Sequence, residues 1–187
     1  MQSEYDVMKN EISGLLEDYK TSYEKEEEHK FEMLNILRDQ DNVFYEESKQ
    51  GHFTASAWVL NYDKTKVLLT LHAKLNRWFQ LGGHIEPTDA TFLDACLREA
   101  QEESGIQSIS ADDYFVIDVD IHKIPENPKA SAHLHYDITM CFIAGRNAEI
   151  NISKESKKLE WIPINKVKEI TDDLAVIRMA EKTLQLF

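Results

Sequence analysis

A glycine pair followed by a run of acidic residues is the part of this chain whose residue types are suited to chemistry. The segment runs from Gly82 to Gly105 and reads GGHIEPTDATFLDACLREAQEESG. Glu99, Glu102 and Glu103 are spaced i, i+3 and i+4, so on a helix their carboxylates project from one face. Carboxylates at that spacing weaken a helix unless a cation lies among them. Oxygen ligands of this kind suit a hard divalent ion, Mg²⁺ or Mn²⁺.

The second half of the segment resembles the signature of the Nudix hydrolases. That signature ends in Arg-Glu-apolar-any-Glu-Glu-any-Gly-apolar, and the stretch from Arg98 to Ile106 fits it at every specified position. The first half departs from it, because Asp89 stands where the family has a glutamate after a five-residue gap from Gly83. Eight residues rather than seven separate Asp89 from Arg98, and Leu81 stands where a proline often precedes the glycines. The loop is therefore expected to be one residue longer.

The resemblance implies an enzyme that cleaves a pyrophosphate bond with Mg²⁺ or Mn²⁺. The metal ligands it implies are Glu102 and Glu103, with Glu99 as a ligand or water-positioning residue and the Gly82 carbonyl as a further ligand. It also implies a catalytic role for Arg98. That arginine is expected to point around the helix from the glutamate face, to pair with Asp89 and to orient the glutamates. Glu86 is close enough in sequence to serve the same site. The alternative interpretation is an ordinary charged amphipathic helix.

The family usually takes an additional base or ligand from a later loop. The candidates in this chain are Glu126, His133, His135, Asp137 and Glu155, and a helix glutamate is a further candidate for the general base. His133, His135 and Asp137 share one strand face by alternation, which suits a row of phosphate contacts, a metal-binding row or an exposed polar face. These three residues and His84, in the predicted glycine turn, are the predicted substrate contacts. His52 and His72 are interpreted as structural.

Composition and charge narrow the class of protein. The chain has 187 residues, 42% of them hydrophobic and 29% charged, which is typical of a soluble globular protein. Its net charge of −13 argues against binding to nucleic acid polymers or anionic membranes. The N-terminus lacks the features of a secretory signal, and the two cysteines, Cys96 and Cys141, are expected to be buried thiols. We therefore expect a cytoplasmic protein.

The charge content and the spacing of apolar residues change near residue 50. Residues 1–50 hold 14 acidic and 6 basic residues, and their apolar spacing predicts two helices joined near Thr21–Glu24. After Gly51, apolar and β-branched runs predict strands at 52–61, 66–72, 78–81, 114–123, 135–144 and 158–162. Helices are predicted at 91–104, 163–167 and 172–186, and the turn of a hairpin is predicted at 61–64.

This order of elements predicts an α/β fold. The resemblance implies the Nudix fold, a mixed β-sheet sandwiched between helices, over residues 51–187, with residues 1–50 as a helical extension. The wider pattern, with HFTASAW at His52–Trp58 and HLHYD at His133–Asp137, resembles a bacterial Nudix subgroup that carries such an extension. The extension is expected to pack on the domain or to form a homodimer contact.

The resemblance favours hydrolysis of a nucleoside diphosphate linked to another moiety, or of a related nucleotide. A non-catalytic nucleotide sensor on the same fold is the alternative, because the loop that holds Asp89 departs from the signature. An isomerase of isoprenoid diphosphates shares the fold, but Cys96 lies inside the glutamate helix and is poorly placed for that chemistry. Turnover of a nucleotide panel would distinguish enzyme from sensor.

Overall fold

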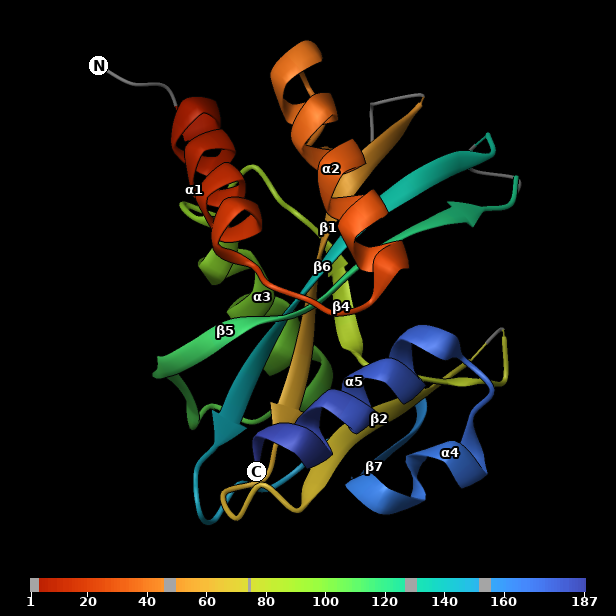
Figure 1. Cartoon of the computed structure of the whole chain (residues 1–187). Coiled ribbons are helices and arrows are strands. Elements are labelled where there is room, and N and C mark those ends of the chain that lie inside the picture. Colours follow the sequence, from red (N-terminus) through yellow and green to blue (C-terminus); the bar gives the residue numbers. More distant parts are fainter. Residues whose placement is uncertain (1–3, 46–49, 74, 127–130, 152–155) are drawn as a thin grey trace. The chain divides into compact units, whose positions relative to one another are not determined.

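The computed structural model describes residues 4–45, 50–73, 75–126, 131–151 and 156–187. Two helices precede a seven-stranded mixed sheet, a single helix interrupts the strands, and short helices close the chain (Figure 1). The helices are α1 (Glu4–Asp18), α2 (Glu24–Asp39), α3 (Phe92–Ser104), α4 (Val167–Ile170), α5 (Leu174–Leu186) and the 3-10 turn η1 (Ile164–Lys166). The strands are β1 (Gly51–Leu60), β2 (Lys66–His72), β3 (Trp78–Phe79), β4 (Leu81–His84), β5 (Ile109–Ile124), β6 (His133–Ala144) and β7 (Ser156–Pro163).

The sheet follows the order β3-β2-β1-β6-β5, with β4 paired to β1 and β7 paired to β2. β1 and β2 form an antiparallel hairpin in which Leu60 faces Val67. The Asn61 side chain closes its turn, because its Oδ1 atom accepts from the backbone N–H groups of Thr65 and Lys66 at 2.9 and 2.8 Å. Lys64 has a φ of 57° within the same turn. The hairpin predicted from sequence is confirmed.

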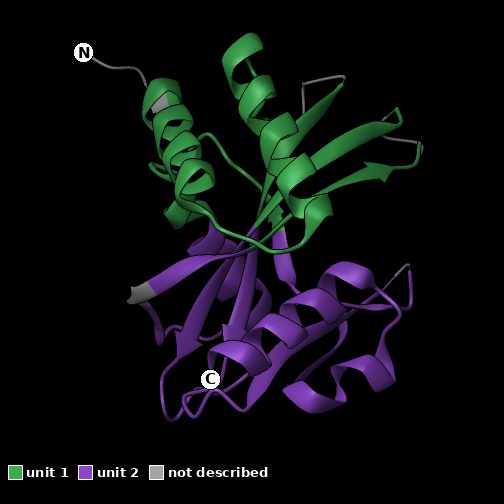
Figure 2. Ribbon diagram, in the orientation of Figure 1, with its two compact units in different colours: residues 1–55, 83–95, 118–138 green, residues 56–82, 96–117, 139–187 purple. Residues whose placement is uncertain are grey.

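The described chain forms two compact units that are each assembled from separate segments (Figure 2). Unit 1 comprises residues 1–55, 83–95 and 118–138, and unit 2 comprises residues 56–82, 96–117 and 139–187. The predicted division of the chain at residue 50 stays a prediction, because these units follow packing and not chain order.

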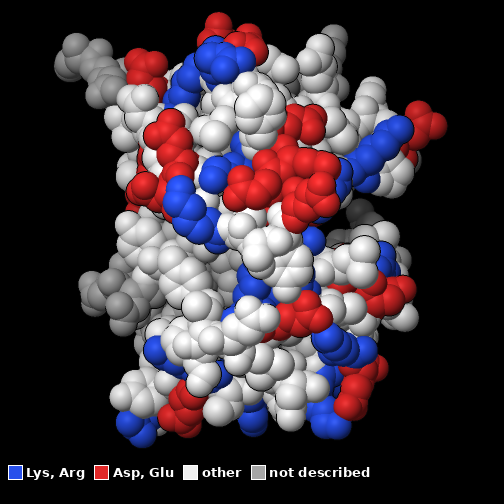
Figure 3. Space-filling model, in the orientation of Figure 1, with Lys and Arg blue, Asp and Glu red and all other residues white. Residues whose placement is uncertain are grey.

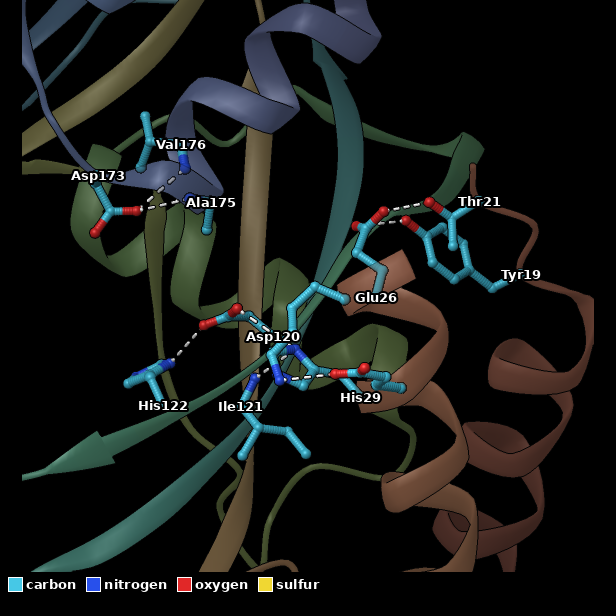
Figure 4. A network of polar contacts seen from close by, with 12 residues as sticks. Tyr19, Thr21, Glu26, His29, Asp120, Ile121, His122, Asp173, Ala175 and Val176 are labelled. Carbon is cyan, nitrogen blue, oxygen red and sulfur yellow. Dashed lines mark hydrogen bonds and ion pairs between the residues drawn. The ribbon is translucent and has the colours of Figure 1, made fainter. Parts of the chain in front are cut away.

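In unit 1, a buried carboxylate joins the first two helices. Glu26 on α2 is fully buried and accepts a hydrogen bond from the Tyr19 hydroxyl at 2.8 Å and another from Thr21 (Figure 4). Burial, followed by the Glu26 charge, raises the pKa of Tyr19. On the same helix, the His29 Nδ1 atom accepts from the backbone N–H of Ile121 on β5 at 3.1 Å. These bonds fix α2 against the linker that follows α1 and against β5. Acidic side chains elsewhere on α2 gather on the surface shown in Figure 3.

The N-terminal extension also caps the helix that carries the three glutamates. The Glu11 carboxylate on α1 accepts from the backbone N–H groups of Phe92 and Leu93 at 2.7 and 3.1 Å. The next N–H, that of Asp94, donates to the Thr91 hydroxyl at 3.0 Å. The first N–H groups of a helix have no partner within it, and a negative charge there also interacts favourably with the helix dipole. α1 therefore stabilises the start of α3.

Replacing the capping carboxylate is expected to weaken the fold. Glu11→Gln removes the charge but keeps the shape, and we expect it to lower the free energy of unfolding by about 1–2 kcal/mol. The exposed Glu17 lies on the same helix, so Glu17→Gln is the matched control and is expected to change stability by less than about 0.5 kcal/mol. Urea denaturation of the full chain measures both. Equal stability of the two variants would show that the cap contributes nothing.

Unit 2 holds an apolar core between strands and the C-terminal helix. Its buried residues are Trp58, Leu60, Val67, Leu69, Ile117, Cys141, Ile162, Ile164, Val167, Val176, Met179 and Ala180. The Trp58 indole N–H donates to the Thr183 hydroxyl on α5 at 3.0 Å. Asp173 caps the start of α5, because its side chain accepts from the N–H groups of Ala175 and Val176 at 3.0 and 3.2 Å (Figure 4).

Most predicted elements are present with shifted ends. The single strand predicted at 78–81 is wrong in detail, because Gln80 separates β3, which pairs with β2, from β4, which pairs with β1. β5 begins at Ile109, five residues before its predicted start.

Cys96 and Cys141 are both buried thiols, as predicted, and burial raises the pKa of Cys141 to about 12. Among the described residues, every helix is too short or too polar to cross a membrane.

Candidate active site

The glycine pair lies in a strand rather than in the predicted turn. Gly82 and Gly83 are the middle residues of β4, and Gly82 has a φ of 148°, a backbone conformation that favours glycine. The Gly82 N–H donates to the Glu103 carboxylate at 3.2 Å. This bond holds the glycine strand against the glutamate-bearing helix α3 within unit 2. The segment's two halves, which are 21 residues apart in sequence, therefore meet in one place.

The cation that lies among the glutamates in this structure is Arg98. One guanidinium nitrogen, Nη1, contacts the Glu99 carboxylate at 2.8 Å and the Glu102 carboxylate at 3.3 Å. The expectation that Arg98 points around the helix from the glutamate face is therefore wrong. Its spacing of four residues from Glu102 places both side chains on one face, and a long arginine also reaches the adjacent Glu99.

Asp89, the predicted partner of Arg98, forms two hydrogen bonds with the backbone of Glu86. The Asp89 carboxylate accepts from the backbone N–H of Glu86 at 2.8 Å, and the Asp89 N–H donates to the Glu86 carbonyl at 3.0 Å. These two bonds form a tight turn between β4 and α3. The pairing of Asp89 with Arg98 stays a prediction.

The donor chemistry of the glutamate face fits a hard divalent ion. Glu99, Glu102 and Glu103 offer carboxylate oxygens, the ligand type that Mg²⁺ and Mn²⁺ prefer. The position of the Arg98 guanidinium shows that a positive charge is accommodated between two of them. The Glu99 side chain is 14% exposed and that of Glu102 is 62% exposed, so water reaches this face from the Glu102 side.

The C-terminal end of the glutamate helix requires a glycine. Gly105 has a φ of 72°, and its N–H donates to the Gln101 carbonyl at 2.8 Å. A Cβ atom at this position would lie 2.6 Å from the Asn151 Cβ atom and 3.1 Å from its backbone oxygen. Both the left-handed conformation and this close approach exclude a larger residue. The predicted end of the helix at Gly105 is confirmed.

The predicted substrate contacts His84, His133 and His135 lie together in unit 1. The Nε2 atoms of His133 and His135 are 3.3 Å apart, and the ring centroids of His84 and His135 are 5.4 Å apart. His84 is the last residue of β4, and His133 and His135 lie on β6. The shared strand face of the two β6 histidines was predictable from alternation, but the position of His84 depends on strand pairing.

His52, interpreted as structural from sequence, lies among these histidines. Its ring centroid is 5.0 Å from that of His84, 5.1 Å from that of His133 and 4.7 Å from that of His135. The side chain is fully buried, and neither ring nitrogen has a hydrogen-bond partner in the described part of the chain. An unsatisfied buried polar group costs about 1–3 kcal/mol. The sequence pattern alone does not place His52 beside these histidines, because the pairing of β1 with β6 brings them together.

His52 and His135 are uncharged at neutral pH. Burial, followed by the neighbouring imidazoles His84 and His133, lowers the pKa of His52 to about 4. Burial and the surrounding histidines lower the pKa of His135 to about 2. Protonation of either ring would place a positive charge in a desolvated site. Both rings therefore keep a nitrogen lone pair available.

The remaining candidates for an additional base or ligand are Asp137, Glu126 and Glu155, and they do not share one environment. Asp137 on β6 is buried and accepts from the Thr54 hydroxyl at 2.6 Å, and its predicted contact with substrate stays a prediction. Glu126 is exposed after β5. Glu155 lies outside the described residues. The structure therefore leaves the choice of general base open between the helix and these later residues.

Comparison with known proteins places the chain in a family. A model of the NUDIX domain matches residues 51–181. A NUDIX-family hydrolase from Clostridium perfringens is similar in structure, with 26% identity, coverage of 73% of this chain and 98% of that one, and a TM-score of 0.50. RenU, a Nudix hydrolase from M. smegmatis, gives 14% identity, 74% and 85% coverage and a TM-score of 0.51.

A putative NUDIX hydrolase from Listeria monocytogenes gives 14% identity, 72% and 95% coverage and a TM-score of 0.52. The two less identical structures show the shared fold. No curated protein sequence matches the chain. The family match, the glycine strand and the glutamate helix agree on one conclusion: the chain belongs to the Nudix family and is a hydrolase of pyrophosphate bonds.

Proposed function

We propose that this enzyme depends on Mg²⁺ or Mn²⁺ and cleaves the pyrophosphate bond of a nucleoside diphosphate linked to another moiety, or of a related nucleotide. The observation that carries the proposal is the bond from the Gly82 N–H to the Glu103 carboxylate, which fixes the glycine strand to the acidic face of α3. Glu99, Glu102 and Glu103 would hold the ion, with the Gly82 carbonyl as a further ligand. When bound, such an ion neutralises diphosphate oxygens and lowers the pKa of water.

The chain's own residues would prepare the site in three ways. The Gly82 N–H orients the Glu103 carboxylate, and the Arg98 guanidinium reduces the repulsion between Glu99 and Glu102. Water that attacks phosphorus must lose a proton to a base. Among the helix glutamates, Glu102 is our candidate for this role, since its side chain is 62% exposed and therefore reaches water. The later candidates for the same role are Glu126, Asp137 and Glu155.

Substrate recognition is proposed to involve the histidine cluster. The predicted contacts are His84, His133, His135 and Asp137. The net charge of −13 repels a phosphorylated substrate, so local attraction has to overcome it. A neutral imidazole N–H donates a hydrogen bond to a phosphate oxygen, and a metal ion held by imidazoles would bind the same oxygen directly.

The location, partners and domain organisation of the enzyme are further parts of the proposal. We propose a cytoplasmic enzyme that acts on small nucleotides and binds neither nucleic acid polymers nor membranes, with residues 1–50 as a helical extension of a domain at 51–187. The cap from Glu11 to α3 supports packing of this extension on the domain. A homodimer through the extension is a further proposal. Sedimentation of the full chain tests it, and a monomer at every concentration would contradict the homodimer.

The experiment that tests the function is a nucleotide screen with product identification. The full chain is incubated with nucleoside diphosphates linked to sugars, nucleosides or phosphates, in Mg²⁺ or Mn²⁺ and in ¹⁸O-labelled water. We expect metal-dependent release of a nucleoside monophosphate, with ¹⁸O in one phosphate product to identify the phosphorus that is attacked. Binding of a nucleotide without turnover in either metal would contradict the proposal and favour a sensor.

A further inference from the structure

Three histidines of unit 1 converge on one point. His52 on β1 and His133 and His135 on β6 each offer a ring nitrogen, and these three nitrogens lie within 4.8 Å of one another. Among the described histidines, cysteines and acidic residues, this is the only group of three whose ligand atoms converge so closely. All three donors are nitrogens, which distinguishes the group from the carboxylates of α3.

The spacing of the two β6 imidazoles fits ligation of one ion. Nitrogens bound at 2.0–2.1 Å to a tetrahedral Zn²⁺ ion lie about 3.3 Å apart. The Nε2 atoms of His133 and His135 are 3.3 Å apart. The His52 ring is nearly parallel to that of His133, with an interplanar angle of 27° and centroids 5.1 Å apart. The ligand nitrogen of His52 lies within 4.8 Å of the other two, so the rings have to move closer together for all three to bind one ion.

A backbone carbonyl fixes the proton of one ligand. The His133 Nδ1 atom lies 2.7 Å from the Ser131 carbonyl oxygen, and a carbonyl only accepts. The proton of a neutral His133 ring is therefore on Nδ1, which leaves the lone pair on Nε2 facing His135. Histidines that bind metals almost always make this bond with their second nitrogen, because it sets the tautomer and the ring orientation.

The buried His52 side chain supplies an independent observation. It is fully buried, and both its ring nitrogens lack a hydrogen-bond partner in the part of the chain that the structure describes. Buried polar groups in native proteins nearly always have a partner, and an ion or water molecule accounts for many exceptions. His84 and His122 also border the trio, with ring centroids 5.0 Å from His52 and 5.4 Å from His135 respectively.

We propose that His52, His133 and His135 bind a divalent transition-metal ion, Zn²⁺ in particular, with ligands other than the glutamates of α3. Neutral imidazoles suit Zn²⁺ and its first-row neighbours and bind Mg²⁺ poorly. Three protein ligands leave the fourth position of a tetrahedral ion to water or to an oxygen of the substrate.

The test is a Zn²⁺ titration of the untagged, full-length protein after treatment with a chelator. Isothermal titration calorimetry in the presence of excess Mg²⁺ is expected to show one Zn²⁺ per chain with a micromolar or lower Kd. His133→Gln and His135→Gln are expected to weaken binding at least about 100-fold, since each removes one of three ligands. His72→Gln, which changes a histidine of unit 2, is the matched control and should bind as the wild type does.

Two further variants make the outcome decisive. Glu102→Gln/Glu103→Gln should retain the Zn²⁺ affinity of the wild type, even where it abolishes turnover, so the two metal sites are tested independently. His52→Gln alters a fully buried residue, so its folding is checked by circular dichroism, and the half-buried His133 and His135 carry the conclusion. Absence of Zn²⁺ binding by the wild type, or unchanged affinity in both β6 variants, would overturn the proposal.

Discussion

Glu103→Gln is expected to lower kcat/KM by roughly 10²–10³-fold on the substrate that the screen identifies. The amide keeps the shape of the side chain and still accepts a hydrogen bond from the Gly82 N–H, which the carboxylate receives at 3.2 Å. What the substitution removes is the negative charge that would hold the divalent ion. Steady-state kinetics over a range of Mg²⁺ concentrations measures the loss.

The control for this result is Glu149→Gln, which removes the same charge from an exposed residue of the same unit. We expect its kcat/KM to equal that of the wild type, because its side chain belongs to no part of the proposed site. A Glu103→Gln enzyme that is as active as Glu149→Gln at every Mg²⁺ concentration would remove Glu103 from the proposed metal ligands.

Trp58→Ala is expected to lower the free energy of unfolding by about 3–5 kcal/mol. The indole is fully buried in the apolar core of unit 2, and its N–H donates to the Thr183 hydroxyl of α5 at 3.0 Å. Truncation leaves a cavity among β1, β2 and the C-terminal helix, which the surrounding side chains fill only in part. Urea denaturation followed by circular dichroism measures the change.

Trp58→Phe distinguishes the effect of the lost side-chain volume from the effect of the lost hydrogen bond to Thr183. The phenyl ring retains most of the buried surface, so we expect a loss of about 1–2 kcal/mol. Thr183 keeps its bond to the Met179 carbonyl at 2.8 Å in both variants. Equal stability of the alanine and phenylalanine variants would show that the core of unit 2 does not depend on the volume of this side chain.

Local features of the chain were predictable from the sequence because they depend on spacing within one segment. The acidic face of α3 follows from the i, i+3, i+4 spacing of its glutamates, and its end follows from the left-handed conformation of Gly105. The two N-terminal helices and the β1–β2 hairpin also depend on local patterns. The Nudix fold, expected from the resemblance, is supported by the family match to residues 51–181.

Features that depend on long-range pairing could not be predicted in the same way. His52 lies beside His133 and His135 only because β1 is next to β6 in the sheet. His52 and His133 are 81 positions apart in the sequence. The cap that Glu11 provides for α3 likewise joins residues 81 apart. The position of Arg98 was mispredicted although it is a local feature, because its spacing of four residues from Glu102 places both side chains on one face of the helix.

The most direct test of the central claim is Mn²⁺ binding to the glutamate face of α3. Electron paramagnetic resonance records the signal of free Mn²⁺ as the ion is added to the wild type, to Glu149→Gln and to Glu102→Gln/Glu103→Gln. We predict that the first two proteins remove at least one equivalent of Mn²⁺ from the free pool, and that the double variant leaves that equivalent free. Equal uptake by all three proteins would contradict the assignment of the metal to these glutamates.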